Sequence, residues 1–370
     1  MGEQSINRPN VIMLLTNGFA PDLRVYKQAV YLTKKGFFVT VFCWDRTGQL
    51  PDVERVDGIV VKRCNISSAY GTGLRQLPAY FRFLLACIRY MNDINCDYLH
   101  CTDLDTMIIS LFCHNKKTRQ LVFDMREFYD SASLAKFSFL AKRITAYMCS
   151  YADYVLYVNE LQLIHLNLHK RDKYIFLPNY PETNKFKNIR KTKSEKIRIA
   201  YIGMVRHFDI LKALLDECSI IQDKVDVFIH GAGIATERLS QYAKKIGYGY
   251  VTGMFDHMNV GALYENCDIV TCIYHENDAN ERRAYPTKLF ESIASCRPIL
   301  TQEGTNAGFF VREHGIGFCV DWKQEGSIMS VLKNIVDCPA SLDSMCEQME
   351  KLRTQYTWEN VVSHMDYAFK

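Results

Sequence analysis

The sequence predicts an α/β protein made of two doubly wound parallel-sheet domains. Short apolar runs alternate with helical segments along nearly the whole chain, the pattern of parallel sheets covered by helices. Its 370 residues exceed what one hydrophobic core usually serves, so two domains of about 150–190 residues are expected. A polar stretch from Pro178 to Lys196 separates two such alternating halves and is the best domain boundary in the chain.

The composition excludes several classes of protein. With 48% hydrophobic and 23% charged residues the chain is globular rather than disordered, and a net charge of +4 gives no support to nucleic-acid binding. No apolar run approaches the roughly 20 residues of a membrane span, and the run Val11–Leu15 after the polar Met1–Asn10 is too short for a signal peptide. The 14 cysteines form no Cys-x-x-Cys pair and fall mostly in apolar segments. They indicate buried thiols in a reducing cytosol, so we expect a cytoplasmic protein, and the cysteines support neither a zinc site nor a disulfide frame.

The first half opens with a strand, a loop containing Gly18, a helix and a second strand. This unit begins a doubly wound domain, whose ligands bind outside the carboxyl ends of the strands. One glycine is not a Gly-x-Gly-x-x-Gly fingerprint, and ordinary turn chemistry also explains it. The strands expected in this half are Asn10–Leu15, Phe37–Trp44, Ile59–Arg63, Tyr98–Cys101, Leu121–Asp124, Tyr154–Val158 and Tyr174–Leu177. The helices expected are Leu23–Lys35, Gly73–Asn92, Asp103–His114 and Leu134–Ser150.

The same alternation restarts after the polar stretch. The strands expected here are Ile197–Ile202, Val225–His230, Tyr250–Gly253, Ile269–Ile273, Pro298–Thr301 and Gly317–Val320. One helix is expected to end at about Ile221, a second to follow Gly231-Ala-Gly233 and a third to begin at Pro286. Two more are expected around Ser341–Gln355 and Trp358–Phe369.

The helix that begins at Pro286 carries the strongest candidate site. Proline suits the first turn, and Leu289 and Ile293 give an apolar stripe at helical spacing. Lys288 and Glu291 are three residues apart and therefore share a face near the N-terminus. The helix N-terminus and Lys288 favour an anion, and Glu291 could accept hydrogen bonds from vicinal ribose hydroxyls, so the pattern predicts a nucleotide. A plain surface ion pair between the two remains the alternative.

The segment Leu74–Met91 combines arginines with aromatic and aliphatic residues. Arg75, Arg82 and Arg89 recur every seven residues along it. A basic amphipathic helix with aromatics can lie on an anionic membrane surface. The alternative is a helix packed on the sheet with its arginines reaching to water, and both stay open.

Six short stretches, in this order, add a resemblance to a known family. They are Asn17-Gly18 through Asp22-x-Arg24-Val25-x-Lys27, His100-x-x-Asp103-x-Asp105, Phe123-Asp-Met-Arg126-Glu127, Tyr201-Ile-Gly-Met-Val-Arg206, Pro286-x-Lys288-Leu289-x-Glu291 with Arg297-Pro298-Ile299, and Trp358-Glu359. Together they resemble the GT-B glycosyltransferases, specifically the retaining glycosyltransferase family 4. The pieces are short, so specificity comes from their order, which covers nearly the whole chain. The resemblance implies two Rossmann-like domains facing a central cleft: an acceptor-side domain at 1–180, a donor-binding domain at 190–356, and a closing helix at 357–370 that packs back on the first.

The resemblance also implies roles for single residues. Glu291 would bind the donor ribose, while Lys288 and the N–H groups after Pro286 would lie near the diphosphate. Arg206 and Lys212 would neutralise it from the other side, although a surface arginine and a helix-face lysine are the plain alternatives. Since fixed cations in a dry site can stabilise the leaving diphosphate, no metal or other cofactor is expected. The implied catalytic set is Arg126, Glu127, Arg206 and Lys212; the donor-binding set is Gly18, Arg206, Gly231, Pro286, Thr287, Lys288, Leu289 and Glu291; the acceptor-side set is Asn17, Asp22, Arg24 and Asp103.

Two positions depart from the family pattern. Arg283 stands where the family's Glu-x7-Glu motif has its first glutamate, which leaves Glu276, Asp278 or Glu281 as replacements. Arg126 stands where the family has a histidine. An arginine cannot exchange protons near neutral pH, but it can hold a phosphate or sugar oxygen.

The main hypothesis is therefore a metal-independent retaining glycosyltransferase that uses a nucleotide-diphosphate sugar, with a UDP-sugar as the expected donor. Its acceptor would be a glycan or lipid-linked glycan in cell-surface polysaccharide biosynthesis, with peripheral membrane contact through 74–91. One alternative is a UDP-sugar 2-epimerase of the same fold, which needs a carboxylate and histidine set that the sequence does not identify. The other is a donor-binding but inactive partner subunit, suggested by Arg283 and Arg126.

Overall fold

The computed structural model describes residues 8–20, 22–69, 73–113, 118–129, 138–187, 189–190, 192 and 194–370, without the side chains of 73–74 and 118–119. Residues 1–7, Pro21, His114, the start of the expected helix at 134–137 and residues 188, 191 and 193 of the polar stretch lie outside the described residues. The chain divides into two compact units. The N-terminal unit comprises the described residues up to Pro178 together with Val361–Lys370, and the C-terminal unit runs from Asn179 to Asn360.

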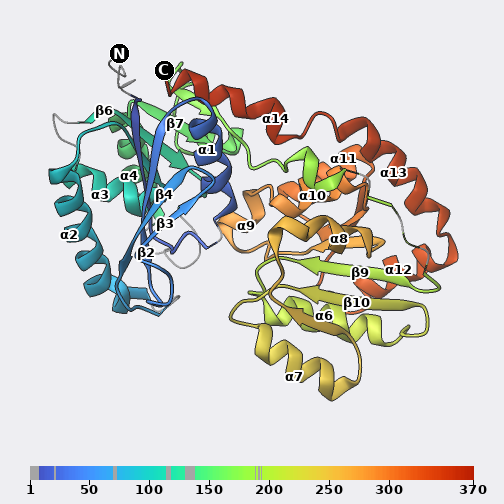
Figure 1. The fold of residues 1–370 in the computed structure, drawn as a ribbon. Coiled ribbons are helices and arrows are strands. Elements are labelled where there is room, and N and C mark those ends of the chain that lie inside the picture. The colour runs from blue at the N-terminus through green and yellow to red at the C-terminus, as the bar shows by residue number, and fades with distance from the viewer. Residues whose placement is uncertain are drawn as a thin grey trace, which may run out of the picture. The chain divides into compact units, whose positions relative to one another are not determined.

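The N-terminal unit is an eight-stranded sheet with helices on both faces (Figure 1). Its strands lie in the order β3-β4-β2-β1-β5-β6-β7-β8, and all neighbours are parallel except β3 and β4. The strands are β1 (Asn10–Leu15), β2 (Phe38–Asp45), β3 (Val53–Val56), β4 (Ile59–Asn65), β5 (Cys96–Thr102), β6 (Thr118–Met125), β7 (Tyr154–Tyr157) and β8 (Tyr174–Phe176). The α-helices are α1 (Leu23–Lys34), α2 (Leu77–Asp93), α3 (Asp103–Cys113), α4 (Ser138–Tyr151) and α5 (Glu160–His165).

Strand order explains where this unit can bind a ligand. The chain leaves β1 for β2 through α1, and later returns to the other side of β1 at β5. Helix α1 covers one face, while α2, α3 and α4 lie on the other (Figure 1). The carboxyl ends of β1 and β5 thus form the switch point at which open α/β sheets bind ligands.

The antiparallel strand β3 was not among the expected elements. Asp57 and Gly58, which join it to β4, have φ angles of 49° and 83°. A two-residue Asp-Gly loop with positive φ at both positions is the preferred connection of a β-hairpin. The dipeptide is visible in the sequence, so this hairpin was predictable.

The C-terminal segment also differs from the expectation. Instead of one helix over 358–369, a four-residue helix α14 (Trp358–Val361) is followed by a 3-10 helix, η5 (Val362–Tyr367). The last residues belong to the N-terminal unit, where the Phe369 ring packs against Phe37 and Tyr98, and Asp366 accepts a hydrogen bond from the Tyr31 hydroxyl. Residues 183–186 of the expected linker form another 3-10 turn, η3 (Thr183–Phe186).

The C-terminal unit is a fully parallel six-stranded sheet in the order β11-β10-β9-β12-β13-β14. Its strands are β9 (Ile197–Ile202), β10 (Val225–His230), β11 (Tyr250–Gly253), β12 (Ile269–Cys272), β13 (Ile299–Gln302) and β14 (Gly317–Val320). Its α-helices before Trp358 are α6 (Phe208–Ser219), α7 (Thr236–Ile246), α8 (Val260–Glu265), α9 (Ala279–Arg283), α10 (Thr287–Ser295), α11 (Asn306–His314), α12 (Ser327–Asp337) and α13 (Ala340–Leu352). This is the Rossmann strand order, with its switch point between β9 and β12. The predicted fold class, two doubly wound α/β domains, is confirmed.

The strands are apolar because helices cover both faces of each sheet. Val11 to Leu14 in β1 and Ile199 to Ala200 in β9 are completely buried. None of the helices in the described part of the chain is long and apolar enough to cross a membrane.

Candidate functional site

The predicted site residues fall into two groups, one in each unit, and each group includes residues of the loop that follows the first strand of its sheet's switch point. In the C-terminal unit, β9 leads into Gly203 and Arg206, and β12 leads into Tyr274 and His275. In the N-terminal unit, β1 leads into Asn17.

Lys288 lies on α10 as a buried cation. Its side chain is largely enclosed, and its Nζ donates to the Tyr274 hydroxyl at 3.2 Å and lies 4.6 Å from the centre of the Tyr201 ring. Burial acts to lower the pKa of this ammonium, while its contacts with Tyr274 and Tyr201 act to raise it. Among the described residues no carboxylate pairs with it. A buried ammonium without a counter-ion is costly, so this position favours an anion from outside the chain.

Gly203 leaves the space that the Lys288 ammonium occupies. A Cβ atom on residue 203 would lie 3.0 Å from Lys288 Nζ, and the φ of 137° at this residue favours glycine. The first N–H groups of α10, at Thr287 and Lys288, lie too near the start of the helix to have a carbonyl four residues earlier within it. Pro286 is the residue that precedes the helix rather than part of its first turn. Ammonium and helix N-terminus together form a site for an anion.

Glu291 lies one turn further along α10 and does not pair with Lys288. Its Oε2 instead accepts a hydrogen bond of 2.7 Å from the hydroxyl of Tyr264, a fully buried residue of α8. Burial raises the pKa of Tyr264 well above its usual value, so the hydroxyl stays a donor. The alternative of a surface Lys288–Glu291 ion pair is therefore wrong for the described structure. Leu289, between them, is completely buried in the core.

The two other cations predicted to neutralise the diphosphate, Arg206 and Lys212, differ in their surroundings. Arg206 is exposed, and the only side-chain hydrogen bond it makes in the described part of the chain is from Nε to the Met204 sulfur, at 2.9 Å. The ammonium of Lys212, by contrast, pairs with Asp216 on the same helix and lies over the Tyr242 ring. Its contacts are those of a helix-face lysine, and its donor role stays a prediction.

The two predicted donor-site glycines have packing reasons of their own. A Cβ on Gly231 would fall 1.8 Å from the Gly203 carbonyl oxygen, so a glycine at 231 allows the two backbone segments to pack closely. A Cβ on Gly18 would fall 2.9 Å from Leu50 Cδ1. These contacts explain both glycines, and direct donor contact stays a prediction.

Each of the three carboxylates considered as replacements for the missing glutamate has a partner. Glu276 pairs with Lys323, and Asp278 caps α9 through the N–H groups of Asn280 and Glu281. Glu281 Oε1 lies 2.7 Å from His207 Nε2. The sequence identified no histidine–carboxylate set, and the structure corrects that by bringing His207 and Glu281 together across 74 residues.

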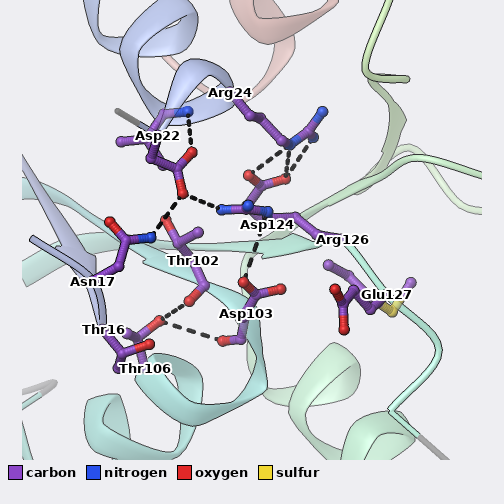
Figure 2. Close-up of polar contacts among 12 residues, drawn as sticks. Thr16, Asn17, Asp22, Arg24, Thr102, Asp103, Thr106, Asp124, Arg126 and Glu127 are labelled. Carbon is purple, nitrogen blue, oxygen red and sulfur yellow. Dashed lines mark hydrogen bonds and ion pairs between the residues drawn. The ribbon is translucent and has the colours of Figure 1, made fainter. Parts of the chain in front are cut away.

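In the N-terminal unit, a chain of polar contacts links the residues after β1 to those after β5 and β6 (Figure 2). Asp22 caps α1 through the Val25 N–H, and its Oδ2 accepts from Asn17 at 3.0 Å and from Arg126 at 3.0 Å. Burial raises the pKa of Asp22, but the Arg126 charge and these hydrogen bonds lower it below the usual value. Arg126 thus holds Asp22 as a carboxylate.

Asp103 completes this network at the start of α3. Its Oδ2 lies 3.7 Å from Arg126 Nε, and its Oδ1 accepts a hydrogen bond of 2.9 Å from Tyr129. Burial raises the pKa of Asp103 to about 7 against the charge of Arg126, and the negative Asp105 and Glu127 add to the rise. Its φ of 70° is unusual for a residue other than glycine. Strained backbone of this kind concentrates at functional sites.

Arg126 and Glu127 differ in how far the protein engages them. Burial opposes charging of Arg126, but Asp103 and Asp22 raise its pKa, so it stays a cation. The Glu127 side chain is exposed, and it has no hydrogen bond in the described part of the chain. Only the Glu127 carbonyl is engaged, by Gln162.

Arg24 is enclosed rather than presented to a ligand. Its guanidinium binds both Asp124 oxygens, at 2.6 and 2.9 Å among other contacts, and donates to the Leu177 carbonyl at 2.8 Å. Burial raises the pKa of Asp124, but Arg24 outweighs it and lowers the value. The pair joins α1 to β6 and to the residue after β8, and an acceptor-side role for Arg24 stays a prediction.

Sequence reasoning missed the aromatic hydroxyls that hold these groups. Tyr264 and Tyr274 are 27 and 14 residues from the α10 residues they contact. Nothing local marks them as partners. Tyr129, two residues after Glu127, was close enough to the Phe123–Glu127 motif to be considered.

No protein-family model matches the sequence, and no curated protein does. Solved structures match over nearly the whole chain. The chain is similar to sucrose-phosphate synthase from Thermosynechococcus elongatus, with a TM-score of 0.78 and 13% identity over 97% of this chain and 98% of that one. It is similar to Anabaena HepE in complex with UDP and glucose, with a TM-score of 0.69 and 11% identity over 96% and 98%. It is also similar to WaaG, a glycosyltransferase involved in lipopolysaccharide biosynthesis, with a TM-score of 0.69 and 11% identity over 97% and 100%.

The chain has the GT-B fold. The predicted fold is thereby confirmed. At this identity the likeness concerns architecture alone.

Proposed function

We propose that this GT-B chain is a retaining, metal-independent glycosyltransferase of family 4 that moves a sugar from a nucleotide-diphosphate sugar, with UDP as the nucleotide, to a glycan or lipid-linked acceptor. The observation that carries the proposal is Lys288, a buried ammonium at a helix N-terminus with no carboxylate partner in the described structure. A diphosphate supplies the charge that this position lacks.

The donor is assigned to the C-terminal unit. Lys288 and the first N–H groups of α10 hold the diphosphate, and the exposed Arg206 approaches it from the β9 loop. As the bond between the anomeric carbon and the diphosphate breaks, negative charge grows on the leaving group, and these fixed donors stabilise it. Glu291, oriented by Tyr264 through one oxygen, uses the other oxygen to accept hydrogen bonds from the ribose. UDP is preferred because HepE was solved with UDP and glucose.

The acceptor is assigned to the N-terminal unit. Asp103 presents a carboxyl that is partly accessible, with 30% of its side chain exposed, and that Tyr129 and Arg126 orient. The exposed Glu127 follows Arg126 and offers hydrogen-bond acceptors to sugar hydroxyls. Asn17 and Asp22 fix the position of Arg126.

Exposed apolar and basic residues on α2, α3 and α4 support a lipid-linked acceptor at the cytoplasmic side of a membrane, as in surface-polysaccharide assembly. Phe83, Cys87 and Met91 of α2 are buried in the core, whereas other apolar residues of α2, α3 and α4 point outward. The exposed apolar residues are Leu77, Phe81, Leu85, Leu111, Phe112, Phe139, Leu140, Tyr147 and Tyr151. Exposed Arg75, Arg82, Arg89 and Arg143 accompany them, and α4 contains no acidic residue. This combination suits an anionic membrane surface.

Calorimetric titration with UDP, GDP and ADP tests the donor site. We expect selective binding of UDP that falls at least tenfold in Glu291→Ala. If no nucleotide binds, or Glu291→Ala binds equally well, the donor assignment is wrong. Binding without turnover with any acceptor supports an inactive subunit, and turnover of a UDP-sugar without acceptor supports the epimerase, for which His207 and Glu281 are the histidine–carboxylate set.

Co-sedimentation with vesicles tests the membrane assignment separately. We expect binding to phosphatidylglycerol vesicles but not to phosphatidylcholine vesicles, and a loss of binding in Phe81→Ser with Phe139→Ser. The matched control is Ile234→Ser, which removes a similarly exposed apolar residue from the C-terminal unit. Equal binding by all three proteins contradicts the assignment.

A further inference from the structure

Two histidines and two carboxylates lie close together beyond the carboxyl ends of the central strands β9 and β12 of the C-terminal unit. His207 directly precedes α6, and Asp209 lies in its first turn. His275 follows β12, and Glu281 lies in α9. The four residues come from two segments, 207–209 and 275–281, which only the fold brings together.

The geometry of this cluster is close to that of a metal site. One ligand atom from each of His207, Asp209 and His275 lies within 4.8 Å of the others. His207 Nε2 is 2.7 Å from Glu281 Oε1, and His275 Nε2 is 3.5 Å from Asp209 Oδ2. The two imidazole rings meet edge to face with centroids 4.7 Å apart. Glu281 lies next to this three-residue cluster through its contact with His207.

Glu281 is held in place by the backbone around it. Its Oε2 accepts a hydrogen bond of 2.9 Å from the His275 N–H, and its own N–H donates to Asp278. This leaves Oε1 directed at His207. Glu281 is thus placed to act either as a fourth ligand or as the outer partner that orients His207, a role that carboxylates commonly take around metal-bound histidines.

We propose that His207, Asp209 and His275, supported by Glu281, bind a divalent transition-metal ion, with Zn²⁺ as the preferred occupant. Two imidazole nitrogens with carboxylate oxygens are a ligand set that suits Zn²⁺, Co²⁺ and Ni²⁺, whereas Mg²⁺ and Ca²⁺ prefer oxygen ligands. The two carboxylates bring the charge that a divalent cation needs. Asp209, with 55% of its side chain exposed, leaves the ion a path from solvent.

The proposal is independent of the glycosyltransferase assignment, which needs no metal. The ion joins the start of α6 to the 275–281 segment, which leads into α10 and Lys288. When the ion is bound, it therefore connects the loop after β9 to the segment that leads into α10. Binding to the folded chain also raises its melting temperature.

The experiment titrates the chelator-treated full chain with Co²⁺ and follows the visible absorption of the bound ion. A Cys338→Ser background removes the one exposed thiol among the 14 cysteines. We expect one Co²⁺ per chain, displacement by Zn²⁺ but not by Mg²⁺, and a higher melting temperature. His207→Ala and His275→Ala should each weaken binding at least tenfold. His314→Ala, which removes a histidine of the same unit outside the cluster, should not.

Three results overturn the proposal: no saturable binding, binding unchanged by both cluster variants, or an equal loss in His314→Ala. Circular dichroism establishes that each variant is folded. If both histidine variants unfold, the exposed Asp209→Asn decides: at least threefold weaker Co²⁺ binding supports the site, and unchanged binding refutes it.

Discussion

The ammonium of Lys288 occupies the space beside Gly203, where a Cβ atom would lie only 3.0 Å from its Nζ. The loop after β9 and the first turn of α10 are therefore fitted to one another. The absence of a side chain at residue 203 leaves room for the cation, which has no carboxylate partner in the described structure.

Gly203→Ala should displace Lys288 and weaken UDP binding about tenfold, a loss of about 1.4 kcal/mol. The matched control is Gly304→Ala, which also has a positive φ but nothing within 4 Å of the added Cβ. Both substitutions should cost stability because of backbone strain. Titration calorimetry separates them: equal UDP affinity in the two variants would contradict the proposed fit.

Lys288→Met should weaken UDP binding by about 100-fold while leaving uridine binding nearly unchanged, because the ammonium is assigned to the diphosphate. Lys351→Met is the control, since that lysine is exposed on α13 and hydrogen-bonds Gln348 of the same helix. The comparison of UDP with uridine distinguishes a lost phosphate contact from a general collapse of the site. A parallel loss for both ligands would argue for collapse.

Tyr264→Phe should reduce UDP affinity by about threefold to tenfold, because Glu291 loses the hydrogen bond that orients it. The effect should be absent for a UDP analogue without ribose hydroxyls, since Glu291 then has nothing to bind. Calorimetry with both ligands measures this. Equal losses for UDP and the analogue would place Glu291 away from the ribose.

Asp103 should give the transfer rate a pH dependence centred near 7, the value to which burial raises its pKa. If the carboxylate orients the acceptor, the rate rises through that pH and levels off above it. Asp103→Asn should be slow and should lack the inflection. The folded-state pKa lies above the usual 3.8, so ionisation costs stability as pH rises from about 4 to 7, and Asp103→Asn should be relatively more stable at pH 8. An unchanged rate profile in the variant would remove Asp103 from the acceptor step.

His100 should make the fold sensitive to acid. Burial lowers its pKa from 6.5 to about 4, and neither ring nitrogen has a hydrogen-bond partner in the described structure. Between these values the unfolded chain binds a proton that the folded chain does not, so stability falls as pH drops from 6.5 to 4. The loss is about 3 kcal/mol. Denaturant unfolding of wild type and His100→Asn at pH 7 and pH 4.5 checks this, and the variant should lose less than wild type.

Most of the fold was accessible from local pattern alone. Every expected strand is present, and Lys288 and Glu291 lie on one helix near its start, because apolar runs and helical spacing are local properties of the chain. The β3–β4 hairpin was also readable, from Asp57-Gly58. What the pattern left undecided was which side chains become partners.

Those partners depend on packing between segments far apart in the sequence. Lys288 and Glu291 bind Tyr274 and Tyr264 instead of each other. Arg24, expected near an acceptor, is enclosed by Asp124 across 100 residues, and His207 meets Glu281 across 74. Periodicity determines which face of an element is buried. The register and order of the strands determine what that face and the loop after each strand will touch. Register and order are set only when the strands of each sheet pair with one another.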